Sequence, residues 1–185
     1  MQKSYYCRGK DGKEREFIVR TATQNDLIEI LKLYNYILED VYPEWFSSSE
    51  DMIANAVLSE DNEALVVLYN NKIVAFGDVF CEKGIRNKLK NILLDRDIDI
   101  PGGHYCMIDD VFVHQGYRGY HLQKALLREL CSCAADKGRD VALITVHPNN
   151  EYSEKNINDS GFIKANEEPL RVDGKTRDYW LKIVV

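Results

Sequence analysis

Val113-His114-Gln115-Gly116-Tyr117-Arg118-Gly119 joins two segments of different hydrophobic periodicity. The run before it, Met107 to Val113, is mostly apolar, as is typical of a buried strand. The segment after it places one apolar stripe along a helix: Leu122, Leu126, Leu130 and Ala134. The sequence therefore predicts a strand, a short glycine-containing loop and a helix in direct succession.

A loop of this kind directs several backbone N–H groups at one place. The first N–H groups of a helix have no partner within it and lie at the positive end of its dipole. Arg118 adds a fixed charge, and the glycines let a ligand approach the backbone closely. The stretch therefore predicts a phosphate or pyrophosphate site. The alternative is a tight turn with a surface arginine, because a short glycine motif alone is weak evidence.

The composition is that of a globular protein with a substantial core. The chain has 185 residues, of which 45% are hydrophobic and 29% charged, so we expect one domain over residues 1–185. No apolar run is long enough to span a bilayer and no secretory signal is seen, so a cytoplasmic protein without a membrane partner is expected. A net charge of −6 disfavours a nucleic-acid partner. The five cysteines lack metal-ligand spacing, so no metal site is predicted.

The other periodicities predict an α+β fold. The expected elements are a hairpin around 9–12, a helix from Gln24, a helix capped by Ser49, strands 64–69 and 73–80, strand 105–113, a helix ending at Gly138, strand 141–146, a helix over 149–160, and closing strands. One strand–helix–strand crossover makes one parallel βαβ step in a mixed, mostly antiparallel central sheet flanked by helices. Residues 1–14 would add an N-terminal strand, and 82–103 would be an insert before the central strand.

Two motifs lie on these elements at matching positions. Val113 to Gln123 is similar to V-x-P-x-x-R-G-x-G-x-G/A, and Asn150-Glu151-Tyr152-Ser153 with Gly161-Phe162 is similar to N-x-x-A/S followed by G-F/Y. In both motifs and in element order, from about Phe17 onward, the chain resembles the GNAT superfamily of N-acetyltransferases. The resemblance implies a GNAT-like fold and transfer of an acetyl group from acetyl-CoA to an amine.

The resemblance also implies which residues hold acetyl-CoA. The pyrophosphate would lie on the backbone of Arg118, Gly119, Tyr120, His121, Leu122, Gln123 and Lys124. The pantetheine arm would run beside Val111, Phe112 and Val113, where a partner strand splays away, with Asn150 and Ser153 on its other side. A helix cap is a parallel role for Asn150.

The chain departs from the family pattern at four positions. Gln115 replaces the proline, while His121 and Gln123 replace small residues of the loop. Many members also carry a tyrosine four residues before the G-F pair, as the general acid for the leaving thiolate. Ile157 stands there in this chain, so the acid must be a neighbour such as Tyr152, or water.

Acetyl transfer needs a neutral amine, and a lysine-like amine has a pKa of about 10.4, so a base must remove a proton. Asp109 is the first candidate base; the alternative is a strand carboxylate paired with a cation. Asp110, next to it, is expected to point to the opposite face. His147, after the second parallel strand, is another candidate, or a loop histidine bonded to the backbone. Tyr152 is a candidate acid or a packing aromatic.

The preferred interpretation is an N-acetyltransferase acting on a primary amine of a small molecule or peptide by direct attack, with a homodimer as a further expectation from the family. The region of Tyr42, Trp45 and Phe46 borders the acceptor site in that family. One alternative is a non-catalytic acyl-CoA-binding module, because the family tyrosine is missing. Another is an RNA-binding G-x-x-G loop of the KH type, although that loop joins two helices.

Overall fold

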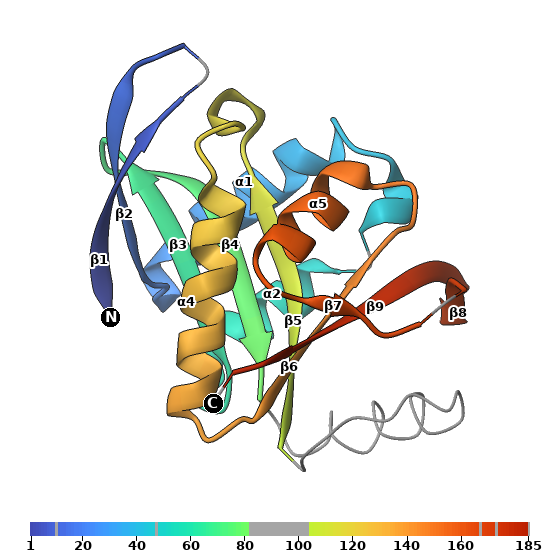
Figure 1. Ribbon diagram of the computed structural model, residues 1–185. Coiled ribbons are helices and arrows are strands. Elements are labelled where there is room, and N and C mark those ends of the chain that lie inside the picture. Colours follow the sequence, from blue (N-terminus) through green and yellow to red (C-terminus); the bar gives the residue numbers. More distant parts are fainter. Residues whose placement is uncertain (10, 47, 82–103, 167, 173, 185) are drawn as a thin grey trace.

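The strands form one mixed sheet (Figure 1). The computed structural model describes residues 1–9, 11–46, 48–81, 104–166, 168–172 and 174–184, so the expected insert over 82–103 lies outside the described residues. Across the sheet the strands are β1 (Gln2–Arg8), β2 (Glu14–Thr21), β3 (Glu63–Tyr69), β4 (Lys72–Phe80), β5 (Tyr105–Val113), β6 (Val141–Val146), β9 (Lys175–Ile183) and β7 (Ile163–Lys164), and β8 (Leu170–Val172) pairs with β9.

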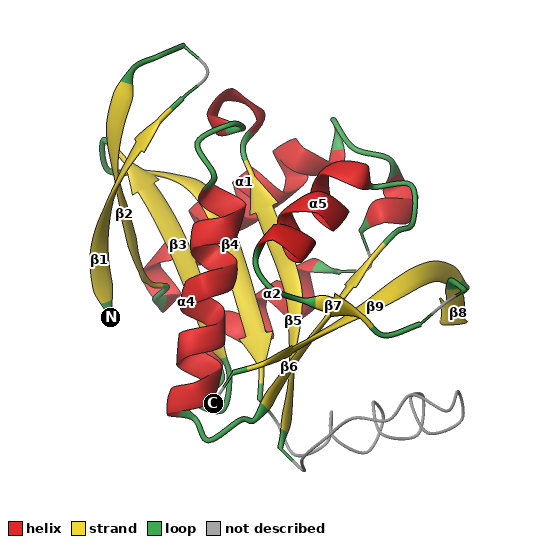
Figure 2. Cartoon of the chain, in the orientation of Figure 1, coloured by secondary structure: helices red, strands yellow, loops and turns green. Residues whose placement is uncertain are grey.

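The sheet pairing confirms the predicted fold class. The pair β5–β6 is parallel, and the other pairs found in the described residues are antiparallel. The helices are α1 (Leu27–Leu38), α2 (Glu50–Leu58), α4 (Leu122–Asp136) and α5 (Glu151–Asp159). Figure 2 shows α4 and α5 on one face of the sheet and α1 and α2 behind it. The leucine stripe of α4 is buried in one core, while Ile30 and Ile53 belong to the core on the opposite face.

Two turns have the backbone conformation that the sequence indicates. Asn70 and Asn71, between β3 and β4, have φ values of 49° and 61°, a left-handed region that asparagine tolerates better than most residues. Gly138 has a φ of 69° directly after the C-cap of α4. Such a glycine commonly ends a helix because it carries no Cβ penalty there.

A β-bulge interrupts β5 at its centre. Gly77 of β4 lies opposite Val111, but Val79 lies opposite Ile108, so β5 carries one residue more than β4 between these pairs. Ile108 packs in the α4 core, and beyond the bulge Val111 packs against that same core. Phe112 packs in the α1–α2 core. The bulge therefore reverses the alternation of side chains along the strand.

The two parallel strands separate at this bulge. Residues 105–108 of β5 pair with residues 141–144 of β6, and the ladder ends there. Thr145 and Val146 of β6 continue to pair with β9 on the other side. A gap therefore opens in the sheet beside residues 109–113, where the sequence predicts a splayed partner strand.

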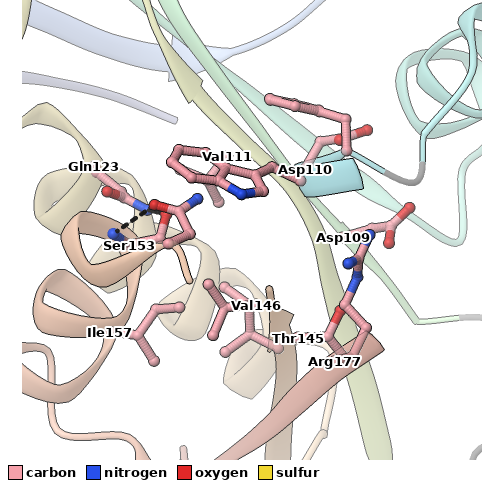
Figure 3. Close-up of a pocket in the computed structure, with 13 residues that line it drawn as sticks. Asp109, Asp110, Val111, Gln123, Thr145, Val146, Ser153, Ile157 and Arg177 are labelled. Carbon is pink, nitrogen blue, oxygen red and sulfur yellow. Dashed lines mark hydrogen bonds between the residues drawn. The ribbon is translucent and has the colours of Figure 1, made fainter. Parts of the chain in front are cut away.

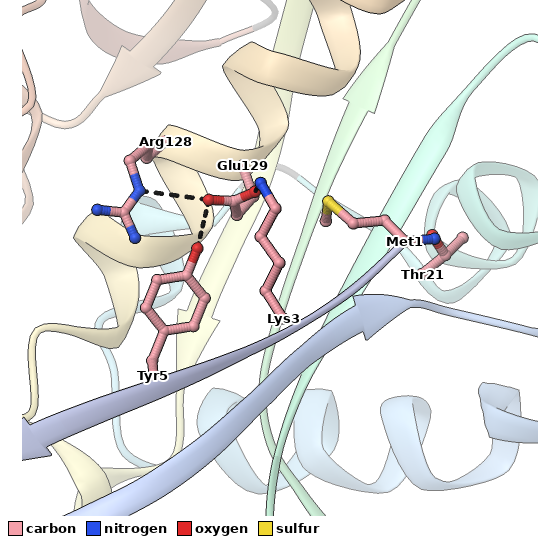
Figure 4. A network of polar contacts seen from close by, with 6 residues as sticks. All are labelled: Met1, Lys3, Tyr5, Thr21, Arg128 and Glu129. Atoms are coloured by element: carbon pink, nitrogen blue, oxygen red, sulfur yellow. Dashed lines mark hydrogen bonds and ion pairs between the residues drawn. The ribbon is translucent and has the colours of Figure 1, made fainter.

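The first strand is fastened to α4 by a buried carboxylate (Figure 4). Glu129 is 2% exposed and accepts hydrogen bonds from Lys3 Nζ at 2.5 Å, from the Tyr5 hydroxyl, and from Arg128 Nε at 3.3 Å. Burial opposes ionisation of this carboxyl, but the hydrogen bonds from Lys3 and Tyr5 outweigh it and hold the pKa of Glu129 below its usual value.

Replacing Glu129 with alanine should lower the free energy of unfolding by about 1–3 kcal/mol, because the partly buried Tyr5 hydroxyl and two cations lose their acceptor. A carboxyl whose pKa is lowered by folding stabilises the fold at pH values above the pKa that it has in the unfolded chain. This contribution is lost as the pH falls through the folded-state pKa. The deficit, measured by urea unfolding at neutral pH, should therefore shrink at about pH 4. Glu29→Ala, which removes an exposed pair with Lys32, is the matched control and should cost under about 0.5 kcal/mol. Equal losses would contradict the prediction.

Candidate active site

A cavity occupies the gap between β5 and β6 (Figure 3). The helix side of this cavity consists of Val111, Gln123, Asn150, Ser153 and Ile157. We call Asp109, Asp110 and Arg177 the carboxylate side, and Trp45 and Phe46 also line the cavity. Ile144, Thr145 and Val146 of β6 complete the lining. One cavity thus joins the start of α4 to a group of charged side chains.

The loop before α4 presents backbone N–H groups without protein acceptors. Within the described chain, none is found for the N–H groups from Gly119 to Lys124, and the next amide, of Ala125, donates to the His121 carbonyl at 3.1 Å. Gly119 and His121 have φ values of 91° and 59°. Since α4 has 15 residues and its dipole is positive at this end, the loop is suited to an anion such as a diphosphate.

Arg118 contributes less to this loop than the sequence suggests. Its N–H donates to the Gln115 carbonyl at 3.2 Å, so the available amides begin one residue later, at Gly119. Its guanidinium lies 3.1 Å from the Asp40 carboxylate. A one-turn 3-10 helix, Gln115–Tyr117, takes up the Arg118 amide, and the sequence pattern did not indicate it.

Three further residues of the predicted loop have side chains committed elsewhere. Tyr120 is 5% exposed, with its ring centroid 5.2 Å from that of Phe17, and Leu122 is buried in the same core. Lys124 Nζ lies 2.6 Å from Asp159 of α5. Tyr120 and Leu122 can therefore serve a ligand through the backbone alone.

A polar bridge crosses the helix side between α4 and α5. Gln123 Nε2 donates to Ser153 Oγ at 3.1 Å, and Asn156 Nδ2 donates to Gln123 Oε1 at 2.7 Å. Asn150 caps α5, since its side-chain oxygen accepts the Ser153 N–H at 3.2 Å. Because Gln123 donates to Ser153 Oγ, the Ser153 hydroxyl keeps its own proton for another acceptor. Phe112 and Val113, expected along the same arm, do not line the cavity.

The bulge brings three carboxyl groups together. Asp110 is 3% exposed and accepts a hydrogen bond from the Ser48 hydroxyl, and its N–H donates to Asp78 Oδ1 at 2.9 Å. Burial, reinforced by the charge of Asp109 and opposed by the Ser48 hydrogen bond, raises the pKa of Asp110 to about 7. Burial and the charges of Asp110 and Asp109 likewise raise the pKa of Asp78 well above its usual value. Asp109 and Asp110 line the same cavity, contrary to the opposite faces expected for an uninterrupted strand.

Arg177 of β9 completes the charged group, and sequence reasoning missed it. Figure 3 shows its side chain beside Asp109. It is 5% exposed; Nη1 donates to the Thr176 carbonyl at 2.9 Å, whereas Nη2 is buried and finds no hydrogen-bond partner among the described residues. Burial lowers the pKa of Arg177, against the opposing charges of Tyr179 and Asp109.

Two predicted catalytic residues do not line this cavity. Tyr152 is 84% exposed, because Ser153, its neighbour on α5, takes the position facing the cavity. His147 Nδ1 accepts the Asn149 N–H at 3.1 Å, and Nε2 lies 3.9 Å from Glu44. Neither supplies an acid or a base inside the cavity. Ile157, at the family's tyrosine position, is buried and lines the cavity.

Comparison with known proteins agrees with this geometry. Residues 30–162 match the model of the acetyltransferase (GNAT) family. The chain belongs to the GNAT family of acetyltransferases. Solved GNAT folds superpose on most of this acetyltransferase: the GNAT domain of S. lividans PAT has 16% identity, a TM-score of 0.68 and 97% of each chain covered. No curated protein sequence matches the chain.

Two further structures extend this likeness. The ribosomal-protein-S18-alanine N-acetyltransferase from Escherichia coli has 16% identity and a TM-score of 0.64, with 91% of this chain and 94% of that chain covered. NAA60 from Arabidopsis thaliana, solved in complex with acetyl-CoA, has 14% identity and a TM-score of 0.67, with 89% and 96% covered. In this GNAT member the G-x-x-G stretch lies between β5 and α4, unlike a KH loop. No helix among the described residues is long and apolar enough to cross a membrane.

Proposed function

We propose that this GNAT member transfers an acetyl group from acetyl-CoA to a primary amine of a small molecule or peptide. The observation that carries the proposal is one cavity whose lining includes both Gln123, in the acceptor-free first turn of α4, and the buried carboxyl groups at the bulge. The amides from Gly119 to Lys124 would hold the diphosphate. Val111, Asn150 and Ser153 would line the pantetheine arm, which leaves the carboxylate side for the amine.

Asp110 is the base that this geometry favours, and Asp109 tunes it. An ammonium group entering the carboxylate side gives up a proton to Asp110, whose pKa of about 7 lets it accept a proton near neutral pH. Acetyl-CoA supplies an acetyl group activated by its bond to sulfur, so the amine nitrogen forms the new C–N bond as the C–S bond breaks and the electron pair stays on sulfur. After the attack the nitrogen still carries one excess proton, and the Ser153 hydroxyl, on the helix side, would relay that proton to the sulfur, so that a neutral amide and a free thiol leave.

The alternative of a non-catalytic acyl-CoA-binding module rests on Ile157. A buried isoleucine at the family's tyrosine position provides no proton, and Tyr152 is too exposed to replace it. Turnover would then depend on Ser153 or on water. Binding and catalysis therefore need separate measurements.

A thermal-shift comparison of acetyl-CoA, longer acyl-CoAs, ATP and NAD tests the binding step. Acetyl-CoA at about 100 times its Kd should add about 2.7 kcal/mol of stability and raise the Tm by roughly 5–10 °C. A panel of amines is then assayed for release of free thiol and for the acetylated product. Binding without thiol release would support the alternative, and equal shifts with ATP or NAD would contradict the proposal.

A further inference from the structure

Arg177 is unusual among the residues that line the cavity. Arg177 is 5% exposed, and its buried Nη2 finds no acceptor in the part of the chain that the structure describes, so a strong donor is left unsatisfied. Buried charges are normally paired, because an unpaired donor loses its hydration without compensation. The planar fork of arginine matches a carboxylate, which it binds through two parallel hydrogen bonds.

We propose that the carboxylate side binds a free α-amino acid or a close analogue, with the acceptor's carboxylate on Arg177 and its ammonium group at Asp110. This inference rests on the proposed function, since it names the amine that the acetyltransferase accepts. Arg177 lines the same cavity as Asp109 and Asp110, so a cation-binding and an anion-binding group face one small space. A zwitterion complements both, whereas a simple amine leaves Arg177 without an added acceptor.

The arrangement also distinguishes an amino acid from a peptide. The ammonium and carboxylate groups of an α-amino acid are separated by one carbon, so both fit a single cavity. A peptide N-terminus carries a neutral amide where the amino acid carries its carboxylate, and an amide cannot neutralise Arg177. Trp45 and Phe46 line the same cavity and offer apolar surface to the acceptor's side chain.

The test compares the common α-amino acids with their amides and their decarboxylated amines. Each set keeps the reacting amine and the side chain and changes only the carboxylate. For wild-type protein, kcat/KM from thiol release should be at least about tenfold higher for the preferred acid than for its amide, which corresponds to loss of a charged hydrogen bond. Because the amide's amine is less basic, a preference for the acid runs against intrinsic reactivity.

Three variants locate this preference. Arg177→Gln should abolish the preference for the acid over its amide, and Arg177→Lys should restore part of that preference. Arg15→Gln is the matched control, because Arg15 also has a buried nitrogen for which the described residues provide no partner, but it lies on β2, outside the cavity. It should keep the wild-type preference. A preference that survives in Arg177→Gln would overturn the proposal.

Calorimetry separates this proposal from the proposed function. The affinity for each acid and for its amide is measured without acetyl-CoA. If the wild type binds an acid more tightly than its amide, and Arg177→Gln does not, this result supports the Arg177 site whether or not thiol is released. Turnover of amides and simple amines at least equal to that of every acid would overturn the inference while leaving the acetyltransferase activity in place. Failure of acetyl-CoA to bind would overturn the proposed function alone.

Discussion

Replacing Gly119 with glutamate should lower the affinity for acetyl-CoA by at least about 100-fold. The new carboxylate would lie beside the acceptor-free amides from Gly119 to Lys124, where it would repel a diphosphate. Like charges brought together in an interface cost several kcal/mol, and about 2.7 kcal/mol corresponds to 100-fold. The affinity is measured by isothermal titration calorimetry, with the Tm as a check on folding.

The control for this variant is Gly138→Glu. Both glycines have positive φ values, 91° and 69°, so a side chain at either position strains the backbone by about 1–2 kcal/mol. Gly138 lies beyond the opposite end of α4, where an added Cβ would meet no atom within 4 Å. Gly138→Glu should therefore lose stability without losing acetyl-CoA. Retained binding by Gly119→Glu, or equal loss in both variants, would show that the diphosphate binds elsewhere.

The sequence predicts the elements of this fold because hydrophobic periodicity determines them. The apolar stripe of α4 spans several helical turns, and the apolar run of β5 spans several residue pairs. In each element several apolar positions therefore agree with the same periodicity. The parallel pairing of β5 and β6 follows from chain connectivity. A helix between two strands of one sheet returns the chain so that the strands run parallel, and this crossover is almost always right-handed. These features do not depend on the orientation of any single side chain.

The direction of individual side chains in the cavity was not predictable in the same way. A bulge of one residue in β5 brings Asp110 into the cavity and pairs it with Ser48, and no turn residue or proline indicates this bulge. Arg177 reaches the cavity from β9, which is distant in sequence from the loop motif. Such contacts depend on tertiary packing, which local patterns do not contain.

The position of Tyr152 outside the cavity is a different case, because the sequence does contain the signal that indicates it. Ser153 and Ile157 are four residues apart and therefore share one face of α5. Both line the cavity, and Tyr152 is turned about 100° away from Ser153. Helical phase would have excluded Tyr152 once Ser153 was assigned to the cavity.

Replacing Asp110 with asparagine should reduce kcat by about 100- to 10,000-fold, the usual contribution of a general base. In the wild type, kcat should rise with pH through about 7, because the base must be ionised to accept a proton. Asp110→Asn should lose this rise. Asp109→Asn should keep it but shift it to lower pH, because the charge of Asp109 raises the pKa of Asp110.

Asp78→Asn is the matched control, because the pKa of Asp78 is raised well above its usual value and the carboxyl is fully buried without lining the cavity. An amide oxygen can still accept the Asp110 N–H, so kcat should change by less than about threefold. A flattened pH profile in Asp109→Asn together with a normal one in Asp110→Asn would assign the base to Asp109 instead.

The pH dependence of the Tm tests the raised pKa of Asp110 without any substrate. A carboxyl whose pKa is raised on folding stabilises the fold in its protonated form, and this contribution is lost as pH rises through the folded value, here about 7. Asparagine carries no charge at any pH, so Asp110→Asn should gain Tm relative to wild type above about pH 7 and lose that advantage in acid. A variant that is slow in catalysis but more stable at alkaline pH would show that the fold bears the cost of a buried base because the reaction needs one.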